Sequence, residues 1–233
     1  MSNRTPVKRM TLFMRLNHWV VAVSMVAAMM TGLYIGYPYY QTLMAEPALD
    51  KYVMAWNRAI HFYAAIIFDV SSIVVAYLYF FSRFEIPYKK LLPPGKNIVE
   101  FFEVFLNLIT LNRRKNFDST HPDSFNAVFF FIFHILLVLM LFTGLQLYVH
   151  GLASGESSIG QWWPWILHVA TDWTLSVFGG MMGVRYVHHY MAWLLVAWVM
   201  FHIYYQVWRT IFWREGDISI VFNGEKYAKS SHS

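Results

Sequence analysis

Four long apolar stretches separated by polar segments dominate the chain and predict helices that cross a membrane. A helix needs about 20 mostly apolar residues to span a bilayer, and the four stretches cover about 17–37, 59–82, 125–149 and 187–212. Thr-Gly steps at Gly32 and Gly144 suit such helices, because small residues allow close approach of a neighbour. The predicted fold is an all-α membrane protein, a bundle of four transmembrane helices, with residues 1–233 forming a single integral membrane domain.

The first apolar stretch follows a basic start, as the core of a secretory signal would. No small-residue cleavage site follows it cleanly, and its length suffices to span a bilayer. We therefore expect it to be a retained first helix.

The two longer connections, 83–124 and 150–186, are predicted to hold interfacial helices. The segment 97–111 is mostly apolar with two glutamates one turn apart, a pattern typical of a helix lying in the membrane surface. The segment 161–180 is rich in tryptophan and ends in Gly-Gly, which indicates a similar helix on the opposite side. Re-entrant or packed loops are the alternative for both segments.

Composition supports a membrane protein and narrows its chemistry. The chain is 58% hydrophobic and 13% charged, against about 25% charged residues in an ordinary soluble domain. The net charge of +5 does not indicate nucleic-acid binding, because the basic residues flank the apolar stretches. The absence of cysteine excludes cysteine-ligated iron–sulfur clusters and covalent c-type haem. Any redox metal must therefore be held by other side chains, and ten histidines are present.

Lysine and arginine are distributed very unevenly between the two predicted faces of the membrane. The N-terminal segment carries four, the 83–124 connection seven and the C-terminal segment four, which is fifteen of the 18 in the chain. Only Lys51, Arg58 and Arg185 fall on the other side. The positive-inside rule therefore predicts that both termini are cytoplasmic.

Histidines within spans are candidate functional residues, because an ionisable group is costly there and a neutral imidazole can bind haem iron. His18 opens the first span near the cytoplasmic face, whereas His61 opens the second near the outer face. The fourth span begins outside with His188 and His189 and reaches His202 about 21 Å later. Depth therefore pairs His61 with His188 or His189 as an outer pair, and His18 with His202 as an inner pair.

The angular positions of His188 and His189 around the fourth helix, relative to His202, distinguish between these two adjacent histidines. At about 100° per residue, the fourteen residues from His188 to His202 return to within roughly 40° of the start, whereas His189 lies about 140° away from His202. Only His188 shares a face with His202. The fourth helix is therefore predicted to present one ligand to each of two haems.

Four arginines accompany these histidines at positions suited to haem propionates. Each lies on the face of its histidine and toward the membrane surface: Arg15, Arg58 and Arg185 precede His18, His61 and His188 by three residues, and Arg209 follows His202 by seven. The alternative is that these arginines simply extend from helix ends to the interface.

The remaining histidines are given structural interpretations. His134 lies mid-span without a partner at its depth and is expected to be a packing residue. His150 and His168 are expected at the interface. His121 is expected in a solvated cytoplasmic loop, from which it could alternatively deliver protons to a quinone. His232 lies in the tail and carries no signal.

Five segments together resemble the b-type cytochrome subunit of membrane-bound nickel–iron hydrogenases, which is related to the gamma subunit of formate dehydrogenase. They are RLNHW (15–19), RAIHF (58–62), RYVHHYMAW (185–193), VMFHIYYQVWR (199–209) and DISIVFNG (217–224). The resemblance covers nearly the whole chain. It implies a di-haem four-helix subunit of the bacterial inner membrane whose ligands are His18, His61, His188 and His202.

The resemblance also implies cofactors and partners. Two haem b groups would carry electrons from a periplasmic iron–sulfur small subunit and nickel–iron large subunit to menaquinone or ubiquinone. We expect the quinone near the inner pair, with His121 and Arg209 as candidate contacts. Partnership with a formate dehydrogenase or thiosulfate reductase, a freestanding ferric or ascorbate-type reductase, and a haemless anchor or transporter remain alternatives.

Overall fold

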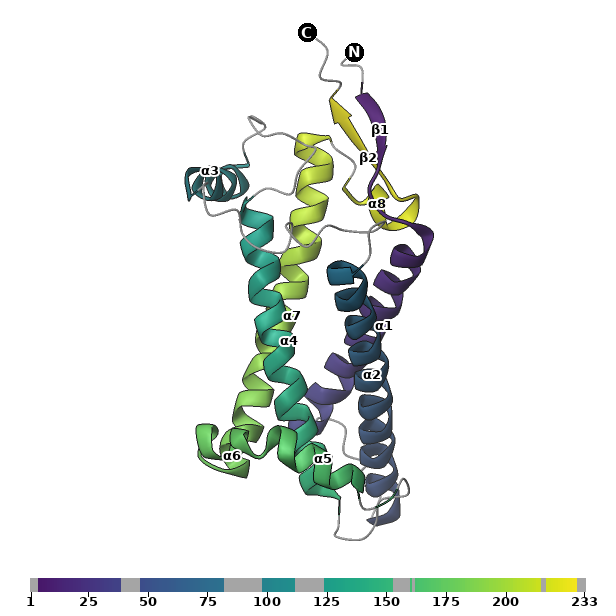
Figure 1. Cartoon of the computed structure of the whole chain (residues 1–233), viewed down its shortest axis with the longest axis vertical. Helices are drawn as coiled ribbons and strands as arrows, with labels where there is room; N and C mark the ends of the chain where they lie inside the picture. The colour runs from purple at the N-terminus through teal and green to yellow at the C-terminus, as the bar shows by residue number, and fades with distance from the viewer. Residues whose placement is uncertain are drawn as a thin grey trace. The chain divides into compact units, whose positions relative to one another are not determined.

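Four of the described helices are long and apolar enough to cross a membrane, as the hydropathy pattern predicts. The computed structural model describes residues 4–38, 47–81, 98–111, 124–152, 160, 162–214 and 217–229. The four helices are α1 (Leu12–Gly36), α2 (Pro47–Phe81), α4 (Ser124–Gly151) and α7 (Met181–Trp208) (Figure 1). The predicted helical membrane fold with four spans is confirmed. Helix α2 begins earlier than its apolar stretch, at Pro47, a residue suited to the first position of a helix.

The chain divides into two compact units, and each contains part of every long helix. The first unit comprises 1–28, 62–132 and 198–233. The second comprises 29–61 and 133–197. His18 and His202 fall in the first unit, whereas His61 and His188 fall in the second. Each predicted histidine pair therefore lies within one unit.

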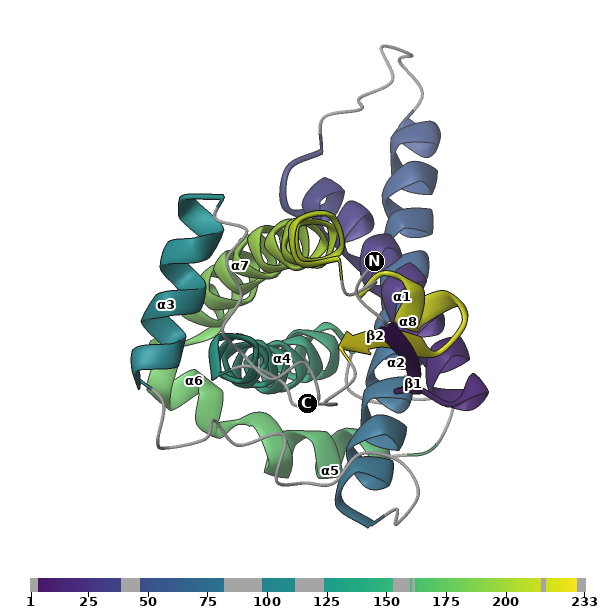
Figure 2. The same cartoon turned by 90° about the horizontal axis from the view of Figure 1, so that it is seen from above.

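In the first unit, the two end segments of the chain form a small sheet that the sequence pattern did not predict. Strand β1 (Arg4–Lys8) pairs antiparallel with β2 (Glu225–Lys229), and Lys8 lies opposite Glu225. Gly224, with φ of 85°, turns the chain into β2, and its carbonyl accepts hydrogen bonds from the backbone N–H groups of Arg9 and Met10. Figures 1 and 2 show the sheet, the short helix α8 (Ser219–Phe222) and the start of α1 side by side.

An aromatic core joins α3 (Ile98–Ile109) to α4 and α7 in the same unit. Val104 and Leu108 of α3 are buried in it. The other members are Phe125, Tyr205, Trp208 and Trp213. Ser124 also donates a hydrogen bond of 2.6 Å to the Glu100 carboxylate. A helix within 97–111 is thus confirmed, and its position in the membrane surface stays a prediction.

A buried ion cluster fixes the C-terminal segment to the end of α7. That helix continues into a π-helical turn (Arg209–Trp213). Asp217 lies 3.3 Å from Arg209 Nε and 3.0 Å from Lys226 Nζ, and all three side chains are at most 7% exposed. Burial lowers the pKa of Lys226 to about 8; the Arg209 charge acts in the same direction, and Asp217 opposes it.

In the second unit, the segment predicted as one helix over 161–180 forms two. Helix α5 (Trp162–Thr171) ends before Asp172, and α6 (Trp173–Phe178) follows. Helix α6 ends because Gly179 and Gly180 adopt positive φ angles of 75° and 89°, and the Gly180 N–H bonds back to the Leu175 carbonyl. The Thr171 hydroxyl bonds to Gln146 of α4, so the first of these helices is tied to a spanning helix.

We expect Asp217→Asn to lower the free energy of unfolding by about 3 kcal/mol, because it leaves two buried cations without their carboxylate. Thermal unfolding of the purified protein in detergent measures the change. Glu103→Gln, at an exposed position on α3, removes a carboxylate without a described partner and should leave the midpoint unchanged. Equal midpoints for Asp217→Asn and the unaltered protein would show that the ion cluster does not stabilise the fold.

Candidate functional site

His61 of α2 and His188 of α7 lie next to each other in the second unit. Their ring centres are 6.4 Å apart and their planes are inclined by 75°. Two imidazoles that bind one metal from opposite sides, each through a bond of about 2 Å, hold their ring centres roughly 6 Å apart. The separation within the predicted outer pair is therefore compatible with two imidazoles that would bind one metal ion.

A threonine hydroxyl lies against the Nδ1 atom of each of these imidazoles. Thr31 Oγ1 is 3.2 Å from His61 Nδ1, and Thr143 Oγ1 is 2.9 Å from His188 Nδ1. The Thr143 hydroxyl donates its hydrogen to the Leu139 carbonyl at 2.7 Å. With the hydroxyl hydrogen assigned to this carbonyl, the oxygen accepts from the His188 ring and Nδ1 carries the proton. The lone pair of Nε2 is left for a metal.

A glycine beside each threonine allows the imidazole to approach the helix backbone. A Cβ atom at Gly32 would lie 3.0 Å from His61 Cε1, and one at Gly144 would lie 3.3 Å from His188 Cε1. Both distances are shorter than ordinary van der Waals contact. The two Thr-Gly steps thus admit a close neighbour, and the residue that approaches is in each case a candidate ligand.

His189, the neighbour of His188, has a different environment. Its Nε2 accepts a hydrogen bond of 3.1 Å from the Trp193 indole. Its ring lies so near α1 that a Cβ atom at Gly36 would be 2.8 Å from it. Since Nε2 is already engaged, the hydrogen bond from Trp193 supports the selection of His188 over His189 as the ligand.

His18 and His202 lie in the first unit and are held by aromatic rings. Trp198 stacks on His202 with ring centres 5.0 Å apart and planes within 7°, and Phe130 contacts the same ring edge-on at 5.6 Å. His18 packs against Trp19, whose indole donates to the Val221 carbonyl at 3.1 Å. His18 and His202 are close enough to interact electrostatically. Within the described part of the chain, the buried Nδ1 atom of each has no hydrogen-bond partner.

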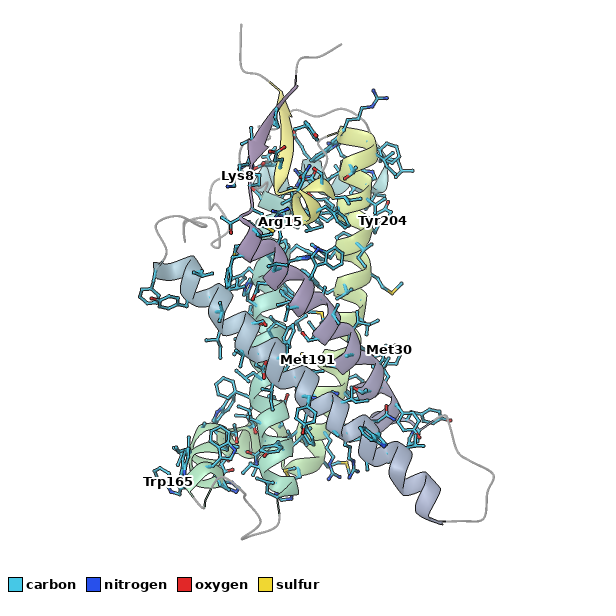
Figure 3. The ribbon with its side chains drawn as sticks, turned by 90° about the vertical axis from the view of Figure 1, so that its right-hand side faces the viewer. Lys8, Arg15, Met30, Trp165, Met191 and Tyr204 are labelled. Carbon is cyan, nitrogen blue, oxygen red and sulfur yellow. The ribbon has the colours of Figure 1, made fainter. Side chains whose placement is uncertain are left out.

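The four predicted propionate arginines divide into two groups. Arg58 and Arg185 are exposed one turn before their histidines, and no described residue pairs with either. Arg15, labelled at the start of α1 in Figure 3, donates to the Phe222 carbonyl. Arg209 is paired with Asp217. A propionate role for all four stays a prediction, and the outer two arginines are the ones without a described partner.

The other histidines that the structure describes have contacts or positions that structural roles explain. His134 is half-buried in α4 beside Phe133. His168 pairs with Asp172 at 2.9 Å on α5, and His150 is exposed at the end of α4. His121, the proposed quinone contact, lies outside the described residues, as does His232.

The family profile described as "Prokaryotic cytochrome b561" matches residues 9–224. The chain belongs to the prokaryotic cytochrome b561 family. The family resemblance predicted from the histidine motifs is confirmed, and the protein is a multi-pass membrane cytochrome. A b-type cytochrome binds haem b, whose iron accepts axial imidazole ligands. Haem is therefore the group that the arrangement of His61 and His188 fits.

Curated relatives in this family carry a common description. The chain is 31% identical over 219 residues to the "Probable Ni/Fe-hydrogenase B-type cytochrome subunit" of Azotobacter chroococcum mcd 1, covering 93% of this chain and 86% of the relative. The protein of that name from Azotobacter vinelandii matches equally, at 31% and the same coverage. The "Probable Ni/Fe-hydrogenase 1 B-type cytochrome subunit" of Escherichia coli (strain K12) is 27% identical over 228 residues, covering 94% and 91%.

We expect Gly32→Val to weaken haem binding by at least about tenfold, because the new side chain displaces His61, and disturbing a ligand's surroundings typically has effects of that order. The haem b content per chain, measured by pyridine haemochrome, reports the loss. Gly151→Val is the control, because Gly151 ends the spanning helix α4 and a Cβ atom there would meet nothing within 4 Å. Unchanged haem content in Gly32→Val would show that the glycine does not accommodate a ligand.

Proposed function

We propose that the chain is the membrane anchor and di-haem electron-transfer subunit of a nickel–iron hydrogenase complex. The observation that carries the proposal is the His61–His188 pair, with ring centres 6.4 Å apart and Nδ1 atoms against threonine hydroxyls. The hydrogenase partner is supported by the names of the curated relatives, which match this chain over nearly all its length.

The second haem in the proposal belongs to His18 and His202. Helix α7 carries His188 and His202 without interruption, and fourteen residues of helix rise by about 21 Å. His188 and His202 are therefore too far apart to bind the same haem iron. The buried Nδ1 atoms and aromatic packing of His18 and His202 suit a second bis-histidine site.

The chain's own residues hold, orient and screen the two haems. His61 and His188 bind the outer one, His18 and His202 the inner one, and Arg58 and Arg185 are available to the outer propionates. Trp198 and Phe130 fix the plane of the His202 ring. When bound, the haems supply one-electron transfer between the partner's iron–sulfur subunit and a quinone.

The proposed quinone, menaquinone or ubiquinone, is reduced near the inner pair on the cytoplasmic side. The concentration of lysine and arginine on the segments with both chain ends supports this orientation in a bacterial inner membrane. Electrons released by hydrogen oxidation outside and protons taken up inside then combine on the quinone. Each elementary charge moved across 100 mV corresponds to about 2.3 kcal/mol, which the reaction must supply.

Replacing the ligands one at a time tests the pairing. We expect His61→Ala and His188→Ala to remove the same haem and to leave the other, because each removes one axial ligand of a single iron. His18→Ala and His202→Ala should remove the second haem. Low-temperature absorption spectra and haem content distinguish the two sets. His189→Ala is the matched control and should retain both haems; loss of one haem in His189→Ala but not in His188→Ala would contradict the pairing.

A quinone-site inhibitor of the hydroxyquinoline oxide class tests two parts of the proposal, the face of the membrane at which quinone binds and the identity of the partner that donates electrons. In membranes containing the whole complex, we expect it to shift the spectrum of the His18/His202 haem and to leave the other nearly unchanged. Hydrogen should still reduce the haems while electron flow to quinone stops. Haem reduction by formate but not by hydrogen, or oxidation of the reduced haems by thiosulfate, would replace the hydrogenase partner. A shift confined to the outer haem would place the quinone on the other face.

A further inference from the structure

We propose that Thr31 and Thr143 are positioning residues that hold Nε2 of His61 and His188 toward the iron and lower the midpoint potential of the outer haem. This inference rests on the proposed haem binding by these two histidines. It concerns residues that bind neither iron nor substrate directly. They act through the imidazole rings.

The two threonines belong to two copies of one local structure. In each copy, a Thr-Gly step on one helix receives the Nδ1–Cε1 edge of an imidazole from another helix. Thr31-Gly32 of α1 receives His61 of α2, and Thr143-Gly144 of α4 receives His188 of α7. In both, the hydroxyl meets Nδ1 while the missing glycine side chain makes room for Cε1. The same arrangement occurs on two separate helix pairs, and all the residues involved belong to the second unit. This repetition indicates that the Thr-Gly step serves to position an imidazole.

The direction of the hydrogen bond is set by the helix that carries the hydroxyl. Thr143 donates to the Leu139 carbonyl one turn earlier, so its oxygen accepts from His188 Nδ1–H. The ring is thereby locked in the tautomer whose Nε2 has a free lone pair. A 180° turn of the ring about its Cβ–Cγ bond would exchange Nδ1 with Cδ2 and lose this hydrogen bond.

The same bond affects the haem electronically. A hydrogen bond from the distal N–H of a ligating histidine raises the basicity of the ligating nitrogen. A more basic axial ligand stabilises ferric over ferrous iron and lowers the reduction potential. Within the described residues, the Nδ1 atoms of His18 and His202 have no such acceptor. The outer haem is therefore the lower-potential one of the two, and electrons entering there move energetically downhill to the inner haem.

Spectroelectrochemical titration of the purified di-haem protein tests this inference. The outer and inner signals are first assigned from the single-haem spectra of His202→Ala and His61→Ala. Thr143→Val, which keeps the side-chain shape but removes the hydroxyl, should raise the outer midpoint potential and leave the inner one unchanged. A tenfold change in the ratio of reduced to oxidised haem corresponds to about 59 mV for a one-electron couple, and we expect a shift of that order. Thr31→Val should act in the same direction, and the two shifts should add.

Two control variants separate positioning from general effects on the fold. Thr143→Ser restores the hydroxyl and should return the potential toward that of the unaltered protein. Thr174→Val removes another buried hydroxyl of the second unit, whose partner among the described residues is the Thr171 carbonyl, and should shift neither haem. Failure of His61→Ala to remove a haem would refute the proposed function itself. Intact binding of both haems, with outer potentials unchanged in Thr143→Val and Thr31→Val, would refute this inference alone.

Discussion

An imidazole placed between apolar helices has two ring nitrogens that need partners, and water is absent to supply either. A polar group left without a hydrogen bond in such a setting costs several kcal/mol. In the second unit, threonine hydroxyls meet the Nδ1 atoms of His61 and His188, and Nε2 is the nitrogen that we propose binds iron. A glycine follows each of these threonines, so the imidazole can come close to the backbone of the helix that carries the hydroxyl.

The first unit differs, because within the described residues the Nδ1 atoms of His18 and His202 have no hydrogen-bond partner. Trp198 and Phe130 enclose His202, and Trp19 lies against His18. The C-terminal segment completes this region: the Val221 carbonyl accepts from Trp19, and Asp217 joins the end of α7 to β2 through Arg209 and Lys226. Aromatic packing holds a ring plane without engaging Nδ1, so the two histidine pairs have different surroundings although both consist of imidazoles.

Much of the candidate site followed from spacing within single helices. The separation of His188 and His202 by fourteen residues was enough to prefer His188, and the engagement of His189 Nε2 by Trp193 supports that preference. The threonines were not recognised as partners of the histidines, although the adjacent glycines were singled out; two Thr-Gly steps in separate spans were the signal available. Arg209 was assigned to a propionate, but its burial against Asp217 could not be anticipated because nothing in the local pattern brings the two together.

Hydropathy and helical period are properties of a segment taken alone, so the four spans, the depths of their histidines and the basic asymmetry could be inferred from the order of residues. Contacts between distant segments could not. Arg15 and the Phe222 carbonyl are 207 positions apart, and β1 and β2 come from opposite ends of the chain. The break of 161–180 at Asp172, the choice of hydroxyl for each imidazole and the burial of Asp217 likewise depend on what packs alongside. Which residues become partners depends on which polar groups come close enough in space to form hydrogen bonds and ion pairs. Those distances are defined only in the folded protein.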